Sequence, residues 1–383
     1  MSRIAVRHGR LGGPGPGDAG AAACGGLTLG VEEEFLLLDP ATGATVPRAA
    51  RVLEGHPPLP DGASLQPELR ATQVESATGI CTTAHELRAQ LRRGRRFLRE
   101  AASLHDTAVA ATGTSVLSGP GVLGANDGRF ARIDELYRGM VADYEACGCH
   151  VHVGMPDRET GVAVLNHLRP WLPALLALSA NSPFDHGRDT GYGSWRMVQQ
   201  SRFPGSGVPP YFADLAAYDD EVARLVDCGA LVDEAMSFWL VRLSSRLPTI
   251  EFRVADTALT VDEAVLQALL SRALVRRALA DLAEGLAAPR LSGQVAAAAV
   301  WTAARDGLDG SAVHPALAQQ VPVERVVAAL LEHVRPALED TGDLEFVREG
   351  VRRLLRDGTG ARRQRHALAA GLPALLTMLT GEA

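Results

Sequence analysis

The chain lacks the features that mark membrane, nucleic-acid-binding or disulfide-stabilised proteins. No run approaches the roughly 20 apolar residues that a membrane-spanning helix needs. The formal net charge is −7, which does not favour nucleic acid or an anionic membrane surface as a partner. The five cysteines are sparse and odd in number, as is typical of reduced thiols in a cytoplasm and not of a disulfide framework. We therefore expect a cytoplasmic protein with no membrane and no nucleic acid among its partners.

The composition and length are those of a globular protein with a large core. Hydrophobic residues make up 46% of the 383 residues and charged residues 22%. Residues 1–26 are rich in glycine and proline and lack an apolar segment of signal-peptide length, so we expect a disordered leader. Residues 27–383 are expected to form one domain, with a sheet-and-helix core over 27–285 and a helical layer over 286–383.

Strand patterns are concentrated in the first two-thirds of the chain. "TLGVEEEFLLLDP", residues 28–40, predicts a strand that turns at "PATG" into a hairpin with "ATVP". "CHVHVGM" alternates between two faces and predicts another strand, as does "PTIEFRVAD". The Gly-, Pro- and Arg-rich segment 185–212 predicts a long loop.

Helix patterns follow and then dominate. Thr83 with Glu86 three residues later is a capping box that predicts a helix. "VLNHLRPWLPALLALSAN" predicts a helix that breaks near Pro170. After about residue 260 the Ala- and Leu-rich segments predict helices packed on the sheet. Strands that cluster early and helices that cluster late indicate the α+β class.

Three adjacent glutamates interrupt the first predicted strand. Because side chains alternate along a strand, Glu32 and Glu34 share one face and Glu33 lies on the other. Two ionised carboxylates about 4 Å apart repel by roughly 4 kcal/mol at an effective dielectric near 20. A divalent cation such as Mg²⁺ removes that repulsion. The alternative is a solvated edge strand whose glutamates face water.

Other acidic strands strengthen the first interpretation. In "PELRATQVE", Gln73 and Glu75 share a strand face, and Glu68 lies just upstream. In "PTIEFRVAD", Glu251 and Arg253 share a face, which suits a site for a metal and a phosphate. The alternative for this last pair is a structural ion pair.

The segment "CGCHVHVG" suggests a further ligand. His150 and His152 lie on one strand face, whereas Cys149 shares the other face with valines and is expected to pack as a small apolar group. A zinc site usually needs two separated ligand pairs, and no matching pair follows in the sequence. We expect His150 to belong to the glutamate-rich metal site or to contact phosphate.

The ordered set of these motifs resembles a known family. "GVEEEF", "PELRATQVE", "CHVHVG", "NSPF", "DTGYGSWR", "SRFP", "WLVR" and "TIEFRVAD" together are similar to the bacterial carboxylate–amine ligases of the glutamate–cysteine ligase type 2 group, over residues 27–285. The resemblance implies a glutamine-synthetase-like catalytic fold, in which a curved antiparallel sheet forms a funnel backed by helices. It also implies ATP-dependent joining of a carboxylate to an amine through an acyl-phosphate, Mg²⁺ as cofactor, small amino-acid substrates and a homodimer.

The resemblance assigns roles to residues that match the motifs. Arg253 and Arg242 are the candidates for contact with phosphate or substrate carboxylate. The segments expected to bind nucleotide and substrate contribute Asn181, Ser182, Arg196, Ser201 and Arg202. The expected metal shell consists of Glu32, Glu34, Glu68, Glu75, His150 and Glu251.

One position departs from the family pattern. The family usually has Trp-Asp-x-Arg where this chain has Trp239, Leu240, Val241 and Arg242. The lost aspartate bears on the amine substrate, so glutamate–cysteine joining is expected to be weak. Two alternatives stay open: a non-catalytic homologue that binds nucleotide or amino acid, and a zinc hydrolase built on His150 and His152.

Overall fold

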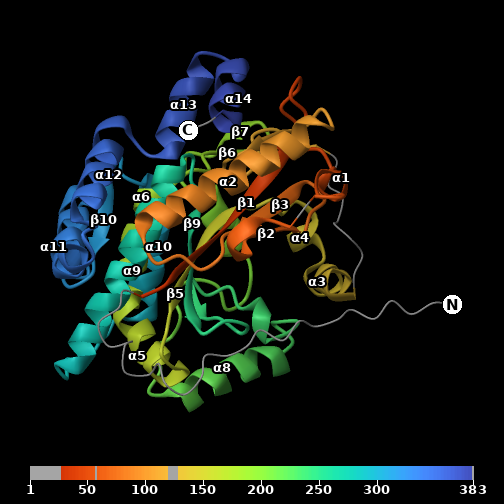
Figure 1. Ribbon diagram of the computed structural model, residues 1–383. Helices are drawn as coiled ribbons and strands as arrows, with labels where there is room; N and C mark the ends of the chain where they lie inside the picture. Colours follow the sequence, from red (N-terminus) through yellow and green to blue (C-terminus); the bar gives the residue numbers. More distant parts are fainter. Residues whose placement is uncertain (1–26, 57, 120–127, 382–383) are drawn as a thin grey trace.

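A mostly antiparallel sheet forms the centre of the molecule (Figure 1). The computed structural model describes residues 27–56, 58–119 and 128–381, so the predicted leader lies outside the described residues. The sheet order is β2-β3-β1-β5-β9-β8, with β4 paired to β1, and each of these pairings is antiparallel. Its strands are β1 (Leu29–Leu38), β2 (Ser64–Pro67), β3 (Gln73–Ala77), β4 (Ala108–Ala110), β5 (Gly148–Gly154), β8 (Val241–Leu243) and β9 (Thr249–Asp256).

Helices cover the sheet and fill the C-terminal part, which confirms the α+β class. The predicted capping box at Thr83 is present at the start of the long helix α2, and Thr260 with Glu263 forms another at the start of α9. The α-helices are α1 (Ala49–Val52), α2 (Ala84–Ser103), α3 (Gly128–Tyr137), α4 (Gly139–Ala142), α5 (Arg158–Leu168), α6 (Leu172–Ser179), α7 (Trp195–Gln200), α8 (Leu215–Asp227), α9 (Val261–Ala283), α10 (Gly293–Asp306), α11 (Val323–Thr341), α12 (Leu344–Asp357), α13 (Gly360–Ala369) and α14 (Leu372–Thr380). Short 3₁₀ helices are η1 (Pro60–Gly62), η2 (Arg169–Trp171) and η3 (Glu234–Met236).

One face of the sheet packs against helices. Helix α2 contacts β1, α9 contacts β5, and the two helices contact each other. Val31, Val151 and Phe252 belong to the main buried apolar cluster, together with residues of α9 such as Leu269. Because side chains alternate along a strand, Glu32 and Glu34 of β1 and Glu251 of β9 lie on the opposite face and point away from this core. Alternation in the sequence therefore predicted the two faces correctly.

Two segments differ from the sequence prediction. Residues 185–212 are not one loop, because β6 (Phe184–Asp185) and β7 (Arg188–Asp189) form a small hairpin and α7 follows it. Ser194 accepts a hydrogen bond from the Met197 amide, which caps α7. The C-terminal part is not wholly helical, because β10 (Ser311–His314) pairs with β11 (Gln319–Pro322).

The break predicted near Pro170 is present, as η2 between α5 and α6. Within the described ranges no helix is long and apolar enough to cross a membrane.

Candidate active site

The first group of carboxylates lies at the β1–β3 pair. Glu34 of β1 is directly opposite Glu75 of β3, and Glu68 precedes β3. Glu34, Glu68 and Glu75 each place a carboxylate oxygen within 4.8 Å of the others. Glu34 and Glu75 are buried, and Glu34 Oε2 accepts a hydrogen bond from the Gly148 amide at 2.5 Å. This trio is called the glutamate triad below.

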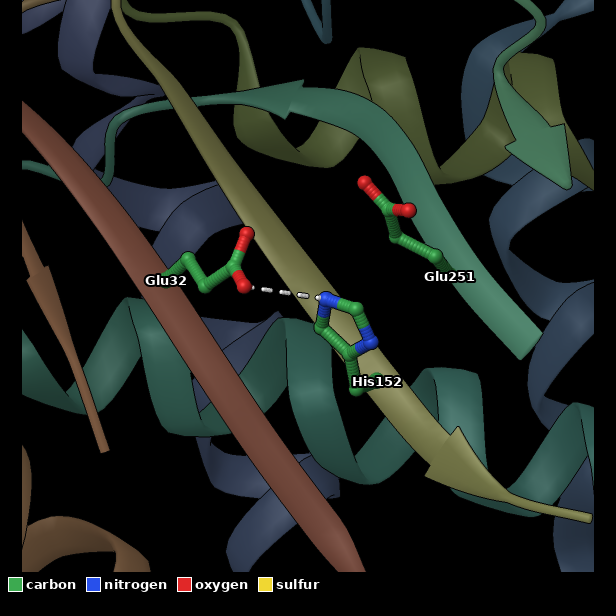
Figure 2. A group of neighbouring side chains, drawn as sticks. All are labelled: Glu32, His152 and Glu251. Carbon is green, nitrogen blue, oxygen red and sulfur yellow. Dashed lines mark ion pairs between the residues drawn. The ribbon is translucent and has the colours of Figure 1, made fainter. Parts of the chain in front are cut away.

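The second group spans three neighbouring strands. Glu32 of β1, His152 of β5 and Glu251 of β9 also have donor atoms within 4.8 Å of one another. Figure 2 shows these side chains on one side of the sheet, with His152 between the two glutamates. His152 Nε2 lies 3.3 Å from Glu32 Oε1, and His152 pairs with Glu251 in the β5–β9 register. This trio is called the mixed triad below.

His150 lies between the two triads. Its Nδ1 is 3.5 Å from Glu32 Oε2, and its Nε2 is 3.8 Å from Glu34 Oε1. Neither ring nitrogen forms a hydrogen bond with a described residue. Burial, followed by the positive charge of Arg253, lowers the pKa of His150 to about 4, although Glu32 and Glu251 oppose this shift. The imidazole is therefore neutral near pH 7, and its nitrogens can act as acceptors or ligands.

Burial favours the protonated form of the three glutamates of the glutamate triad. Burial and the charge of Glu68 raise the pKa of Glu34 to about 8, against the opposing effect of Arg196. Burial and the neighbouring carboxylates raise the pKa of Glu75 well above its ordinary range, and burial also raises that of Glu68. Carboxylates crowded in this way bind a proton or a cation. An all-oxygen set with uncompensated charge suits a hard divalent cation.

The two glutamates of the mixed triad are ionised instead. Burial alone would raise the pKa of Glu32, but the neighbouring imidazoles of His150 and His152 outweigh it and lower that pKa. Burial likewise opposes ionisation of Glu251, yet the charges of Arg253 and Arg242 lower its pKa. His152 Nε2 makes no hydrogen bond with a described residue, so this nitrogen is available to a cation beside the two carboxylates.

Two arginines form ion pairs with the carboxylate of Glu251. Arg242 forms a fork to it, with Nε–Oε2 at 2.8 Å and Nη2–Oε1 at 3.2 Å, and Arg253 Nη1 donates to Oε1. Arg242 Nη1 donates to the carbonyls of Ala235 and Ser237, so each of its nitrogens has a partner. The buried Arg253 Nε has none among the described residues. Arg253 is therefore the better placed of the two to contact a ligand anion.

The residues predicted for nucleotide and substrate contact fall into two sets. Asn181, Ser182 and Arg196 surround the buried carboxylate of Asp256, which accepts hydrogen bonds from the Asn181 amide and Ser182 Oγ and lies 3.9 Å from Arg196 Nη1. The Asn181 side chain also bonds the carbonyls of Ala111 and Thr257, so these groups are committed to holding the fold.

Ser201 and Arg202 lie apart from that network. Both are exposed. Ser201 Oγ donates to the Val198 carbonyl, and Arg202 Nη1 is 2.9 Å from Asp143 Oδ1. The described structure does not bring either residue into the two triads.

Arg196 joins the Asp256 network to the carboxylate site. Its Nη2 donates to the Arg253 carbonyl, and its Nη1 makes no hydrogen bond with a described residue. The guanidinium passes so close to Gly148 that a Cβ there would lie 2.4 Å from Nη2 and 3.0 Å from His150 Nε2. Gly148 thus allows this approach while its amide holds Glu34. Sequence reasoning missed both Gly148 and Asp256, although each lies in a motif already singled out.

Glu33 and the strand cysteines belong to the interior. Glu33 forms a buried fork with Arg95 of α2, with distances of 2.6 and 3.0 Å. Cys149 is 1% exposed and packs in the main apolar cluster, as predicted. Burial raises the pKa of the Cys147 and Cys149 thiols well above the ordinary value. Neither cysteine belongs to a candidate metal group in the described part of the chain.

Leu240, the departure from the family pattern, also faces the interior. It is fully buried in the main apolar cluster, while Arg242 lies on the carboxylate face. The substitution therefore changes packing beneath β8 and removes no group from the two triads.

Comparisons with known proteins identify the family of the chain. The profile of "Glutamate-cysteine ligase family 2(GCS2)" matches residues 28–381. A protein of Saccharopolyspora erythraea named "Putative glutamate--cysteine ligase 2-2" is 57% identical over 352 residues, which cover 91% of this chain and 90% of that protein. A Salinispora arenicola protein, "Putative glutamate--cysteine ligase 2", is 44% identical over 89% of this chain and 90% of its own length.

Solved structures show the same fold. The crystal structure of the Francisella tularensis glutamate–cysteine ligase in complex with AMP has a TM-score of 0.72 at 14% identity, covering 92% of this chain and 87% of that chain. A bifunctional glutathione synthetase from Pasteurella multocida has a TM-score of 0.64 at 16% identity, covering 93% of this chain and 52% of that chain. The matches confirm the predictions of a glutamine-synthetase-like fold and of an ATP-dependent carboxylate–amine ligase. The chain belongs to the glutamate–cysteine ligase family 2.

Proposed function

We propose that this chain joins the carboxylate of an amino acid to an amine through an acyl-phosphate, at the sheet face that carries the two triads. The observation that supports this most strongly is the position of Arg253, a half-buried cation beside two separate groups of candidate metal ligands. Phosphoryl transfer to a carboxylate brings anions together, and such a site supplies fixed positive charge where they meet.

Mg²⁺ fits the donor atoms that are present. The glutamate triad offers carboxylate oxygens only, and the mixed triad adds His152 Nε2, a buried nitrogen that forms no hydrogen bond with the described part of the chain. When bound, Mg²⁺ would neutralise phosphate charge and bridge the protein and the nucleotide. We therefore propose Glu32, His152 and Glu251 as one ligand set and Glu34, Glu68 and Glu75 as the other, with His150 between them.

The protein's own residues have distinct tasks in this proposal. Glu251 orients both arginines, and Arg242 holds Glu251 in place because its other donor is fixed by two backbone carbonyls. Arg253 contributes the charge that stabilises the transferring phosphoryl group. No protein nucleophile is needed, since the amine attacks the acyl carbon and phosphate leaves.

The substrate pair, the assembly and the location complete the proposal. Glutamate and cysteine are the first pair to test, because the relatives carry that name. The described cysteines are free thiols, as is typical of a cytoplasmic protein, and the family resemblance favours a homodimer. We therefore propose a cytoplasmic homodimer in which residues 27–383 form a single catalytic domain.

A substrate screen tests this function. Purified protein is incubated with ATP, Mg²⁺ and pairs of amino acids, and ADP release is measured. The expected result is ADP release that needs both an acid and an amine and that is absent from the Glu251→Gln variant. ATP binding without pair-dependent ADP release would contradict catalysis and favour a binding homologue.

A further inference from the structure

Two arginines outside the candidate active site lie over the ring of one tyrosine. Arg169 begins η2, Tyr211 precedes α8, and Arg290 lies between α9 and α10. The Cζ atom of Arg290 is 3.4 Å from the centre of the Tyr211 ring, and that of Arg169 is 5.8 Å from the same centre. These two side chains are called the arginine pair below. They bring together segments that are far apart in the sequence.

Arg169 is buried with one donor unused. It is 3% exposed, its Nε donates to the Pro209 carbonyl at 2.8 Å, and its Nη2 donates to the Leu291 carbonyl at 3.3 Å. Its Nη1 makes no hydrogen bond with a described residue. A buried charged donor without a partner is unfavourable unless something else satisfies it.

The described residues place no carboxylate in an ion pair with the arginine pair. Within the described ranges, neither Arg169 nor Arg290 forms an ion pair. Burial, and then the charge of Arg290, lowers the pKa of Arg169, and only Tyr211 opposes this. Two neighbouring guanidinium groups repel each other, and Arg169 cannot relieve this by moving into water.

Two other buried arginines, Arg95 and Arg272, are each paired with an acid. Arg95 and Arg272 are each 3% exposed, and each has a carboxylate at 2.6 Å, from Glu33 and Asp343 respectively. The positive charges of Arg95 and Arg272 are therefore neutralised locally. Arg169 has a second arginine instead.

We propose that the arginine pair binds a phosphate group, either as inorganic phosphate or on a small phosphate monoester. Arg290 is exposed and meets the ligand first, and the buried charge of Arg169 adds attraction at short range. A dianion matches the two uncompensated positive charges, and guanidinium groups are well suited to phosphate. This site is independent of the ligase reaction, because none of its three side chains belongs to either triad.

Residue-resolved labelling tests the proposal on the unaltered protein. Phenylglyoxal modification of each arginine is followed by peptide mass spectrometry, without nucleotide or divalent cation, at increasing inorganic phosphate. Parallel titrations use glycerol 3-phosphate and acetate. At a phosphate concentration about ten times the Kd, modification of Arg290 is expected to slow by about tenfold. Arg325, an exposed arginine of α11, serves as the internal control and is expected to react at an unchanged rate.

Variants separate this site from phosphate bound at the triads. Arg290→Gln and Arg169→Met are each expected to raise the Kd of phosphate by about tenfold in calorimetric titration, whereas Arg325→Gln leaves it unchanged. Protection by inorganic phosphate alone identifies the free ion as ligand, and stronger protection by glycerol 3-phosphate identifies a monoester. If Arg290 reacts at the same rate with and without either phosphate, or if acetate protects equally well, the proposal is wrong. The labelling result stands even if Arg169→Met does not fold.

Discussion

Glu33 and Glu34 are adjacent and both buried, yet replacing each by glutamine is expected to change stability in opposite directions. Glu33 forms a fork with Arg95, whereas Glu34 is crowded by Glu68 and Glu75. Glutamine keeps the shape of the side chain and removes its charge. The pair of variants therefore reports the electrostatics of two neighbouring positions with little change in volume.

The magnitude for Glu34 follows from its pKa. The value rises from 4.5 to about 8, so between these pH values the native carboxyl keeps a proton that the unfolded chain has lost. The folded state then binds more protons than the unfolded state, and stability falls as pH rises through that window. The free energy of unfolding falls by about 1.4 kcal/mol for each pH unit in this window, and the total loss by pH 8 is on the order of 4 kcal/mol.

The variants are compared by urea unfolding in EDTA at pH 5 and pH 8. Glu34→Gln is expected to unfold close to the parent at pH 5 and to be more stable at pH 8 by about 2–4 kcal/mol. Glu33→Gln leaves Arg95 without its buried partner and is expected to lose about 3–5 kcal/mol. Added Mg²⁺ should stabilise Glu34→Gln less than it stabilises the parent and Glu33→Gln, because only the mixed triad remains complete in Glu34→Gln. Equal destabilisation of both variants at pH 8 would refute the reasoning.

Other variants test the remaining parts of the site. Glu251→Gln should abolish ligation and also lower the free energy of unfolding by about 3 kcal/mol, because Arg242 and Arg253 both lose their counter-charge. Normal turnover at saturating Mg²⁺ would reject the ligand role of Glu251. His152→Ala should weaken Mg²⁺ binding by about tenfold in calorimetry, and no more than a twofold effect would remove it from the ligand set. His150→Ala should lower turnover while Mg²⁺ affinity changes less than in His152→Ala, and the reverse order would exchange their roles. Cys149→Ala should keep full activity with Mg²⁺, and a requirement for Zn²⁺ would revive the zinc interpretation.

Local patterns predicted the faces of the sheet but not its irregularities. Strand alternation separated Glu32 and Glu34 from Glu33, and the structure confirms this division. The β5–β9 register shifts between Cys149 and Val151, however, and the strand pattern in the sequence does not show where such a bulge falls. The sequence analysis therefore favoured His150, while the structure puts His152 opposite Glu251 and in the mixed triad.

The other differences between the sequence prediction and the structure arise from contacts between residues that are far apart in the chain. Ser182 and Asn181 were expected near nucleotide, but their bonds to Asp256 depend on a strand some 75 residues away. Helix α7 forms inside a Gly- and Pro-rich segment because Ser194 caps it, a signal that the composition of the segment obscured. Such pairings arise only when the sheet has assembled.

Transfer of ¹⁸O from the acid substrate tests the central claim most directly. The amino acid found active in the screen is labelled with ¹⁸O in the carboxylate and turned over with ATP and the amine, and the released phosphate is analysed by mass spectrometry. An acyl-phosphate route transfers one labelled oxygen to inorganic phosphate for each amide formed, and the nucleotide product is ADP. Label in AMP, or phosphate that carries no ¹⁸O, would contradict the account.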